Sequence, residues 1–269
     1  MDRIRPAAVA GSFYPGQRAA LGEQIDRFLT GAAAPAETVT PPKALIVPHA
    51  GYIYSGPIAA SAYRLLAGHA GGVRRVVLLG PVHRVPVRGL ALPEAEGFAT
   101  PLGVVPLDRR SIAAIRDLPQ VGVSGAAHAF EHSLEVQLPF LQSVLDDFTL
   151  VPLAVGDASP DEVAEVLERL WGGTDTVIIV SSDLSHYLTY DEARRTDRST
   201  VDTILALGPD EITHHQACGG TPVNGLLRAA RAHGLRARLL DLRNSGDTAG
   251  DRDRVVGYAA VAFTEEARA

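Results

Sequence analysis

The chain has 269 residues, of which 46% are hydrophobic and 21% charged, and its formal net charge is −6. This composition is typical of a folded globular protein and excludes disordered and collagen-like chains. The single cysteine excludes an intramolecular disulfide and a cysteine-rich zinc finger.

Charge and hydropathy also limit the kinds of partner that we expect for this protein. Arginines alternate with acids, as at 251–254, instead of forming a basic stripe, so we expect no nucleic-acid partner. The N-terminus lacks the apolar region of a signal peptide, and runs such as 76–79 are far shorter than the about 18 residues of a membrane helix. We therefore expect one domain over residues 1–269, in the cytoplasm, with no membrane partner.

Short β-branched apolar runs alternate with amphipathic helical patterns along the chain. The expected helices cover 18–29, 58–66, 133–145, 159–170, 191–205 and 222–233. The expected strands cover 44–47, 75–79, 150–154, 176–180, 238–242 and 255–263, with a small β excursion within 88–107. The alternation predicts an α/β fold whose central sheet is mostly parallel, with helices on both faces.

Three details of this pattern can be checked. Ser159, with Glu162 three residues later, predicts a capping box before the helix at 160–170. Pro139 lies inside the helix expected at 133–145 and should kink it. The Ala/Pro/Thr-rich stretch 31–42 has the composition of a surface connection.

Histidines follow three of the apolar strands. His49 comes two residues after the strand ending at Val47, His83 four after Leu79, and His186 six after Val180, with Asp183 in between. The carboxyl ends of parallel strands share one edge of a sheet, where ligands bind, so these loops should converge. Two imidazoles from separate strand ends could form a metal site, although each could also be an ordinary loop residue.

Cys218 and His132 are further candidates. Cys218 precedes Thr221 and Pro222, which can begin a helix, and a helix N-terminus favours the metal-binding thiolate; the alternative is a small buried apolar residue. Glu131 and His132 begin a helix, either as capping residues or as part of a pocket. His69 and His233, beside helix-ending glycines, favour structural roles, and His128, His214 and His215 stay unassigned.

Taken together, these motifs resemble the MEMO family, known in prokaryotes as AmmeMemoRadiSam system protein B. The matching segments are 5–15, the His49 and His83 loops, 131–135, 182–187, 218–219, 245–247 and 256–258. The family is similar in fold to class III extradiol ring-cleaving dioxygenases, whose non-haem iron(II) is held by two histidines and a carboxylate.

The resemblance implies roles for individual residues. His49 and His83 match the two histidine ligands, and Cys218 matches the third family ligand, a cysteine where the dioxygenases have a carboxylate. His186 matches the acid/base histidine. Asp183 could complete the coordination or fix the tautomer of His186. Because a thiolate also suits copper(I) and zinc, the ligand types leave the metal open, with iron(II) or copper favoured over zinc.

Three functions are compatible with this centre. The leading hypothesis is an iron- or copper-dependent oxidoreductase in which Asp183 and His186 transfer protons. The alternative is a non-catalytic protein that binds a small-molecule or peptide ligand, or a radical SAM partner, beside His132 and the group Tyr52, Tyr54, Arg84 and Tyr187. A zinc hydrolase, with the same ligands and Asp183 or His186 as base, comes third.

Overall fold

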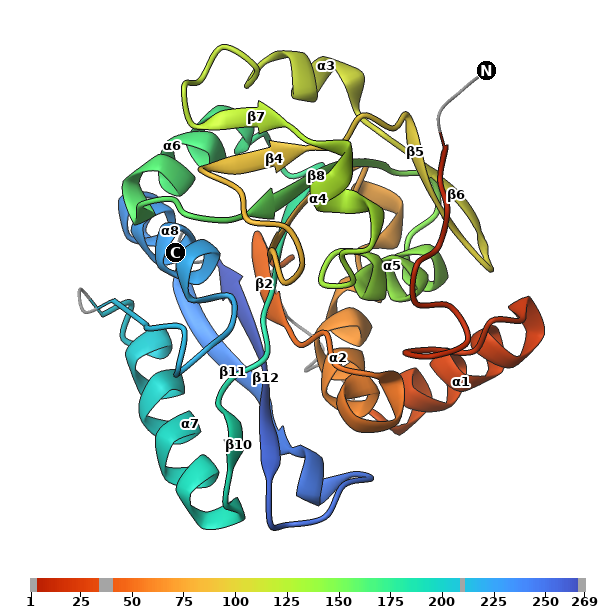
Figure 1. Ribbon diagram of the computed structural model, residues 1–269, viewed down its shortest axis with the longest axis vertical. Coiled ribbons are helices and arrows are strands. Elements are labelled where there is room, and N and C mark those ends of the chain that lie inside the picture. The colour runs from red at the N-terminus through yellow and green to blue at the C-terminus, as the bar shows by residue number, and fades with distance from the viewer. Residues whose placement is uncertain (1–3, 34–40, 209–210, 266–269) are drawn as a thin grey trace.

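The computed structural model describes residues 4–33, 41–208 and 211–265, which form a mixed sheet between two layers of helices (Figure 1). The main sheet has the order β10-β12-β2-β9-β3-β8-β4-β7, and β11 pairs with β12. Its strands are β2 (Ala44–Val47), β3 (Arg75–Pro81), β4 (Leu90–Leu92), β7 (Val121–Val123), β8 (Thr149–Val155), β9 (Thr176–Ser181), β10 (His186–Leu188), β11 (Arg236–Asn244) and β12 (Val255–Thr264). A second sheet holds β1 (Ile4–Arg5), β5 (Gly97–Thr100) and β6 (Gly103–Pro106).

The centre of the main sheet is parallel, and antiparallel pairs join the flanking strands to it. Strands β2, β9, β3 and β8 pair parallel with one another. Strand β12 pairs antiparallel with β2 and with β11, and β4 pairs antiparallel with β8. The α/β prediction is therefore confirmed, with a mixed sheet that is parallel at the four apolar strands and again at its edge, where β4 pairs with β7.

Helices cover both faces of the sheet, as predicted. The longer ones are α1 (Arg18–Gly31), α2 (Tyr52–Ala67), α5 (Leu138–Val144), α6 (Pro160–Leu170), α7 (Tyr190–Leu205) and α8 (Gly220–Ala232). The short ones are α3 (Arg109–Ala113), α4 (Gly125–Ala129), η1 (Ala70–Gly72), η2 (Glu135–Gln137) and η3 (Ser245–Asp247).

Successive side chains of the central strands enter two different apolar clusters. Leu45 and Val47 of β2 pack in one cluster with residues of α1, α2 and α5. Ala44 and Ile46 pack in the other cluster with residues of α6, α7 and α8. This two-residue alternation explains the unbroken apolar runs, because both faces of each central strand are buried.

The two largest differences from the sequence-based prediction of the helices concern α2 and the region 133–145. Helix α2 begins at Tyr52, not at Ile58, and tolerates Pro57 in its second turn. The helix expected at 133–145 is divided into η2 and α5, and Pro139 occupies the first turn of α5 instead of kinking a longer helix. The first turn is where a missing N–H costs least. The capping box of Ser159 and Glu162 is confirmed. Most of the 31–42 connection lies outside the described residues.

No helix in the described part of the chain is long and apolar enough to cross a membrane.

A buried ion pair ties the N-terminal segment to the rest of the molecule. Arg5 meets the Glu135 carboxylate at 2.6 Å, and both side chains are almost completely buried. The other hydrogen bonds to Glu135 come from the backbone N–H groups of Ala8 and Val9 and from the Tyr14 hydroxyl. A buried charge is tolerated when it is paired and hydrogen-bonded in this way. These bonds therefore hold segment 5–14 against η2, the short helix that carries Glu135.

Asp197 is a buried carboxyl on α7. It accepts a hydrogen bond from the Ser185 backbone N–H at 3.0 Å. A Cβ at position 257 would lie 1.9 Å from the Asp197 carboxylate, so only glycine fits there. Burial raises the pKa of Asp197 to about 6, although the hydrogen bonds from Ser185 act in the opposite direction.

Replacement of Asp197 by Asn should stabilise the protein in a pH-dependent way. Because the folded state raises this pKa from 3.8 to about 6, the cost of burying the charge is absent below pH 3.8 and complete above pH 6. We expect Asp197→Asn to increase the free energy of unfolding by about 1–3 kcal/mol at pH 8 and to have little effect at pH 3.5. Urea unfolding at both pH values measures this, with the exposed Asp26→Asn as control. A variant less stable than wild type at pH 8 would contradict the assignment.

Candidate metal centre

Three adjacent parallel strands bring the predicted residues together. His49 follows β2, Asp183 follows β9 and His83 follows β3, and these strands are neighbours in the order β2-β9-β3. The carboxyl ends of β2 and β9 are level, since Val47 pairs with Ser181. The convergence expected from the strand-end rule is therefore present in the structure.

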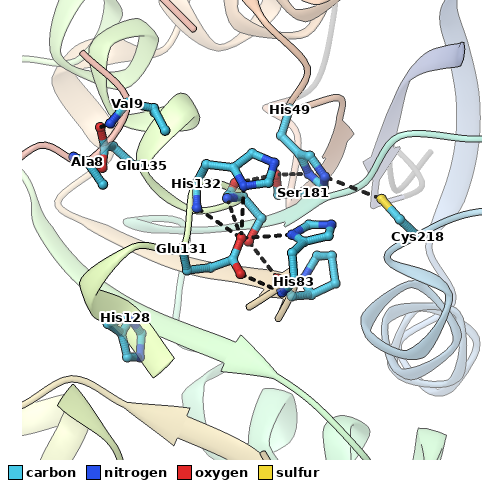
Figure 2. Close-up of polar contacts among 12 residues, drawn as sticks. Ala8, Val9, His49, His83, His128, Glu131, His132, Glu135, Ser181 and Cys218 are labelled. Atoms are coloured by element: carbon cyan, nitrogen blue, oxygen red, sulfur yellow. Dashed lines mark hydrogen bonds and ion pairs between the residues drawn. The ribbon is translucent and has the colours of Figure 1, made fainter. Parts of the chain in front are cut away.

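Three histidines form a compact cluster at this edge (Figure 2). His49, His83 and His132 each offer a ligand atom, and these atoms all lie within 4.8 Å of one another. The His83 and His132 rings stack with centroids 4.6 Å apart, and the His49 ring lies 5.2 Å from His83 and 5.5 Å from His132. Imidazoles at this separation can hold one metal ion between them.

The Glu131 carboxylate orients two of these histidines. Its Oε1 accepts the His83 Nδ1–H at 2.8 Å and its Oε2 accepts the His83 backbone N–H at 2.6 Å. Oε1 also accepts the N–H groups of His132 and Ser133, each at 2.9 Å. Burial by itself raises the pKa of Glu131, but the hydrogen bonds from His83 and Ser133 outweigh it and lower the pKa to about 2. The ionised carboxylate can only accept, so Nδ1 of His83 carries a proton, and Nε2 is the nitrogen that can present a lone pair to a metal ion.

Ser181 fixes the tautomer of His49 in a similar way. The Ser181 hydroxyl donates its only proton to the Ser133 carbonyl at 2.6 Å and accepts from the Gln137 amide at 2.7 Å. The 2.9 Å contact between His49 Nδ1 and Ser181 Oγ must therefore have His49 as the donor. Burial and the neighbouring histidines hold the pKa of His49 well below 6.5, so the ring is neutral with a lone pair on Nε2.

Cys218 lies beside this lone pair. Its Sγ is 3.3 Å from His49 Nε2, and its backbone N–H donates to the Asp183 carbonyl. Helix α8 begins at Gly220, two residues before the expected start, and Thr221 does not cap it. Burial raises the pKa of the thiol to about 12, with the Asp183 charge adding to the rise. In the protein without metal the thiol is thus protonated, which differs from the thiolate expected from the helix start.

Asp183 and His186 adjoin the cluster. Asp183 is buried and accepts the His49 backbone N–H at 2.7 Å, and burial raises the pKa of its carboxyl. His186 Nδ1 lies 2.8 Å from the Leu184 carbonyl, which can only accept, so Nδ1 carries the proton and Nε2 is free. A carboxyl with a raised pKa and an imidazole whose Nδ1 is held by a carbonyl therefore lie side by side next to the cluster.

The four remaining pocket residues are divided between core and surface. Tyr52 is buried in the core, where its hydroxyl donates to the Val136 carbonyl at 2.8 Å. Tyr54 is half-buried, and Arg84 is exposed next to His83. Tyr187 is 63% exposed and has a φ of 61°, a left-handed conformation that is unfavourable for an aromatic residue. The Arg254 guanidinium stacks over its ring at 5.0 Å.

The other histidines lie outside the cluster. His128 is buried, with Nε2 2.8 Å from the Ala91 carbonyl, and Figure 2 shows it well apart from the three rings. His214 contacts the Cys218 carbonyl, and His215 is exposed. His233 stacks on Trp171 and pairs with Glu168. The Nδ1 of His69 lies 3.3 Å from the Leu65 carbonyl.

Sequence reasoning missed how the centre is supported. Glu131 has both of the roles considered for it, because the same carboxylate caps the turn at 132–133 and orients His83. Nothing in the sequence marked Ser181 as a partner of His49, because it is simply the last residue of an apolar strand. His132 is part of the cluster although no strand precedes it directly, and its neighbour Glu131 was the only local indication.

The fold and the site define the class: this is an α/β protein with a histidine cluster at the carboxyl ends of its parallel strands. Comparison with known sequences then shows its family. The model of the family described as Memo-like protein matches residues 5–262. The MEMO1 family protein of Ignicoccus hospitalis is 38% identical, over 97% of this chain and 98% of the relative. That of Aquifex aeolicus is 36% identical, over 97% and 99% of the two chains. The chain belongs to the Memo family, which confirms the resemblance drawn from its motifs.

Replacement of Glu131 by Gln should destabilise the protein near neutral pH. Because the folded state lowers this pKa from 4.5 to about 2, its contribution is complete above pH 4.5 and is lost as the pH falls toward 2. We expect Glu131→Gln to lower the free energy of unfolding by about 3 kcal/mol at pH 7, with a smaller difference at pH 3. Chemical unfolding at both pH values tests this. The exposed Glu23→Gln should change neither value, and an equal loss at both pH values would argue against an ionised Glu131.

Proposed function

We propose that this protein binds one transition-metal ion, iron(II) or copper, at its histidine cluster and uses it for redox chemistry. His49 and His83 are the two histidine ligands. The observation that carries the proposal is that Ser181 and Glu131 hold the Nδ1 side of both rings, which leaves Nε2 of each ring as the nitrogen that can bind a metal ion. A metal ligand needs such a lone pair and such a partner on its other nitrogen.

The donor set fits a metal ion in two further respects. His132 Nδ1 is buried and forms no hydrogen bond among the described residues, although Glu131 Oε1 lies 3.4 Å from it. Several neutral or weakly charged donors meet in one place, and no arginine or lysine pairs with them in the described structure. A cation is the partner that such a set lacks.

Cys218 is the proposed third ligand, and His132 is the competing donor. Family membership favours Cys218, whose sulfur lies 3.3 Å from His49 Nε2. Local geometry favours His132, which completes the three-histidine cluster. The two sets differ chemically, because a thiolate adds a negative charge and prefers softer metals such as copper(I), whereas three imidazoles also suit iron(II) and zinc.

Iron or copper bound here would supply one-electron redox chemistry. The protein's own groups hold and move protons. Asp183, with its raised pKa, can keep a proton beside the cluster, and His186 Nε2 can take one. Glu131 and Ser181 keep the imidazole rings in one orientation.

Metal content tests the ligand assignment. Protein purified without air and loaded with iron(II) or copper(I) should hold one metal per chain, and His49→Ala and His83→Ala should each reduce this at least tenfold in elemental analysis after dialysis, because each removes a ligand that the other donors cannot replace. Of the two candidate third ligands, Cys218→Ala should weaken retention more than His132→Ala. The exposed His215→Ala is the control. Metal content equal to wild type in the variants of His49, His83 and Cys218 would disprove the site.

Oxygen uptake tests the redox proposal. The loaded protein should change its absorption spectrum when O₂ is added with a catechol or a simple reductant. His186→Gln should retain the metal but slow oxygen uptake at least tenfold, because the amide cannot take up a proton. An oxygen electrode and elemental analysis on the same sample separate the two effects. No spectral change with any reductant would argue against turnover.

A second candidate function is binding without turnover, and Tyr187 favours it. An exposed aromatic residue held in a left-handed conformation, with Arg254 against its ring, is typical of a recognition surface. A peptide or a radical SAM protein would then contact Tyr187, Tyr54 and Arg84 at the rim. Binding lost in Tyr187→Ala, in a protein with no oxygen uptake, would favour this function.

A further inference from the structure

A cavity that shares no residue with the histidine cluster lies between α7 and the end of β11. Its volume is about 620 Å³, within the range of small-molecule sites. Four arginines line it, and they come from two elements: Arg194, Arg195 and Arg198 from α7, and Arg243 from β11. In Figure 1, α7 runs alongside β10 and the β11–β12 pair, so the cavity has one helical wall and one wall of sheet.

The three helical arginines form one face of α7. Arg194 and Arg195 lie four and three residues before Arg198, so each of them is a neighbour of Arg198 on the helix surface. An arginine-rich helix face is often merely solvated. Here the face lines a hollow instead of a convex surface, and Arg243 faces it from the sheet side.

Three of the four arginines at this cavity form no close ion pair with another described residue. The Arg194 guanidinium lies 5.7 Å from the centre of the Tyr190 ring, and Arg198 has a long ion pair with Asp202, at 4.0 Å. Arg195 forms no ion pair within the described residues. Arg243 is the exception, since it is held by Asp241 at 2.6 Å. Exposed arginines without partners add little to folding, so their charge is available to a ligand.

The aspartates of the cavity are occupied by the protein itself. Asp247 accepts the Tyr190 hydroxyl on Oδ1 and the Asn244 N–H on Oδ2. Asp197 is buried and accepts the Ser185 N–H. Asp191 lies in the first turn of α7, where the helix dipole favours a carboxylate. The lining thus holds four arginines against three aspartates, one net positive charge when all are ionised, in a chain whose net charge is −6.

We propose that this cavity binds a small phosphate-bearing ligand. The planar guanidinium group presents paired N–H donors that match phosphate oxygens, and several guanidinium groups around one hollow match a polyphosphate better than a single carboxylate. The surrounding acidic protein repels anions, so binding requires a local group of this kind. Asp197 and Asn244, both 2% exposed, also line the cavity, and the Asn244 amide is the neutral one of the two.

Pyrophosphate is the probe for this site, because it carries several charges and needs no base or sugar contact. Protein treated with EDTA, so that no metal is present, is titrated with pyrophosphate in a calorimeter at low salt. We expect saturable binding of one pyrophosphate per chain, weakened at least tenfold in the double variant Arg195→Gln/Arg198→Gln. The exposed Arg27→Gln on α1 is the matched control and should change the dissociation constant by less than twofold. If the double variant does not fold as wild type by circular dichroism, Arg195→Gln alone should weaken binding at least threefold.

Two further titrations locate and classify the ligand. His83→Ala should bind pyrophosphate as wild type does, which places the site away from the histidine cluster. Citrate should bind at least tenfold more weakly than pyrophosphate. The proposal is overturned if there is no saturable binding, if the double variant binds as wild type, if His83→Ala abolishes binding, or if citrate is the tighter ligand.

Discussion

The candidate metal centre depends on the carboxylate of Glu131, which joins two segments that are distant in the sequence. Four N–H groups point at its two oxygens, two from His83, one from His132 and one from Ser133. The loop after β3 and the turn before η2 are therefore fixed to the same carboxylate. Without it the His83 ring could rotate about its side-chain bonds, and its distance from His49 would no longer be defined.

A second buried carboxylate supports the first. Arg5 donates to Glu135 through one nitrogen and to the Glu131 backbone carbonyl through another, and its Nε donates to the His128 carbonyl. The N-terminal segment thereby holds the backbone that carries Glu131. Both carboxylates are buried, and each is stable as an anion only because several donors surround it. The loss of one donor therefore costs more than one hydrogen bond, since a buried charge would be left partly unpaired.

The sequence predicted which strand ends meet at the candidate centre better than it predicted the contacts that orient the histidines there. Apolar strands followed by His49, His83 and Asp183 are a sufficient signal, because the geometry of a parallel sheet alone brings strand ends together. Long-range partners give no local signal. The bond from His49 to Ser181 joins residues 132 positions apart, and only the register of β2 against β9 makes it possible. Tyr52 differs from the expectation in another way. It was expected at the pocket because of its position in the sequence, but the structure places its ring in the core.

Cys218 shows why a local rule can give the wrong protonation state. A helix N-terminus stabilises a thiolate, but burial and the nearby Asp183 carboxyl stabilise the thiol, and in this structure they dominate. The cysteine backbone is nevertheless held close to β9. Gly219 donates to the Ser182 hydroxyl, and a Cβ on this glycine would lie 2.7 Å from the Ser182 side chain. The approach that brings the sulfur to His49 therefore requires glycine at position 219.

A cation that replaced the thiol proton would supply the positive charge that the buried sulfur lacks. The same burial that disfavours a free thiolate would then strengthen its attraction to the metal, because the surroundings screen that attraction weakly.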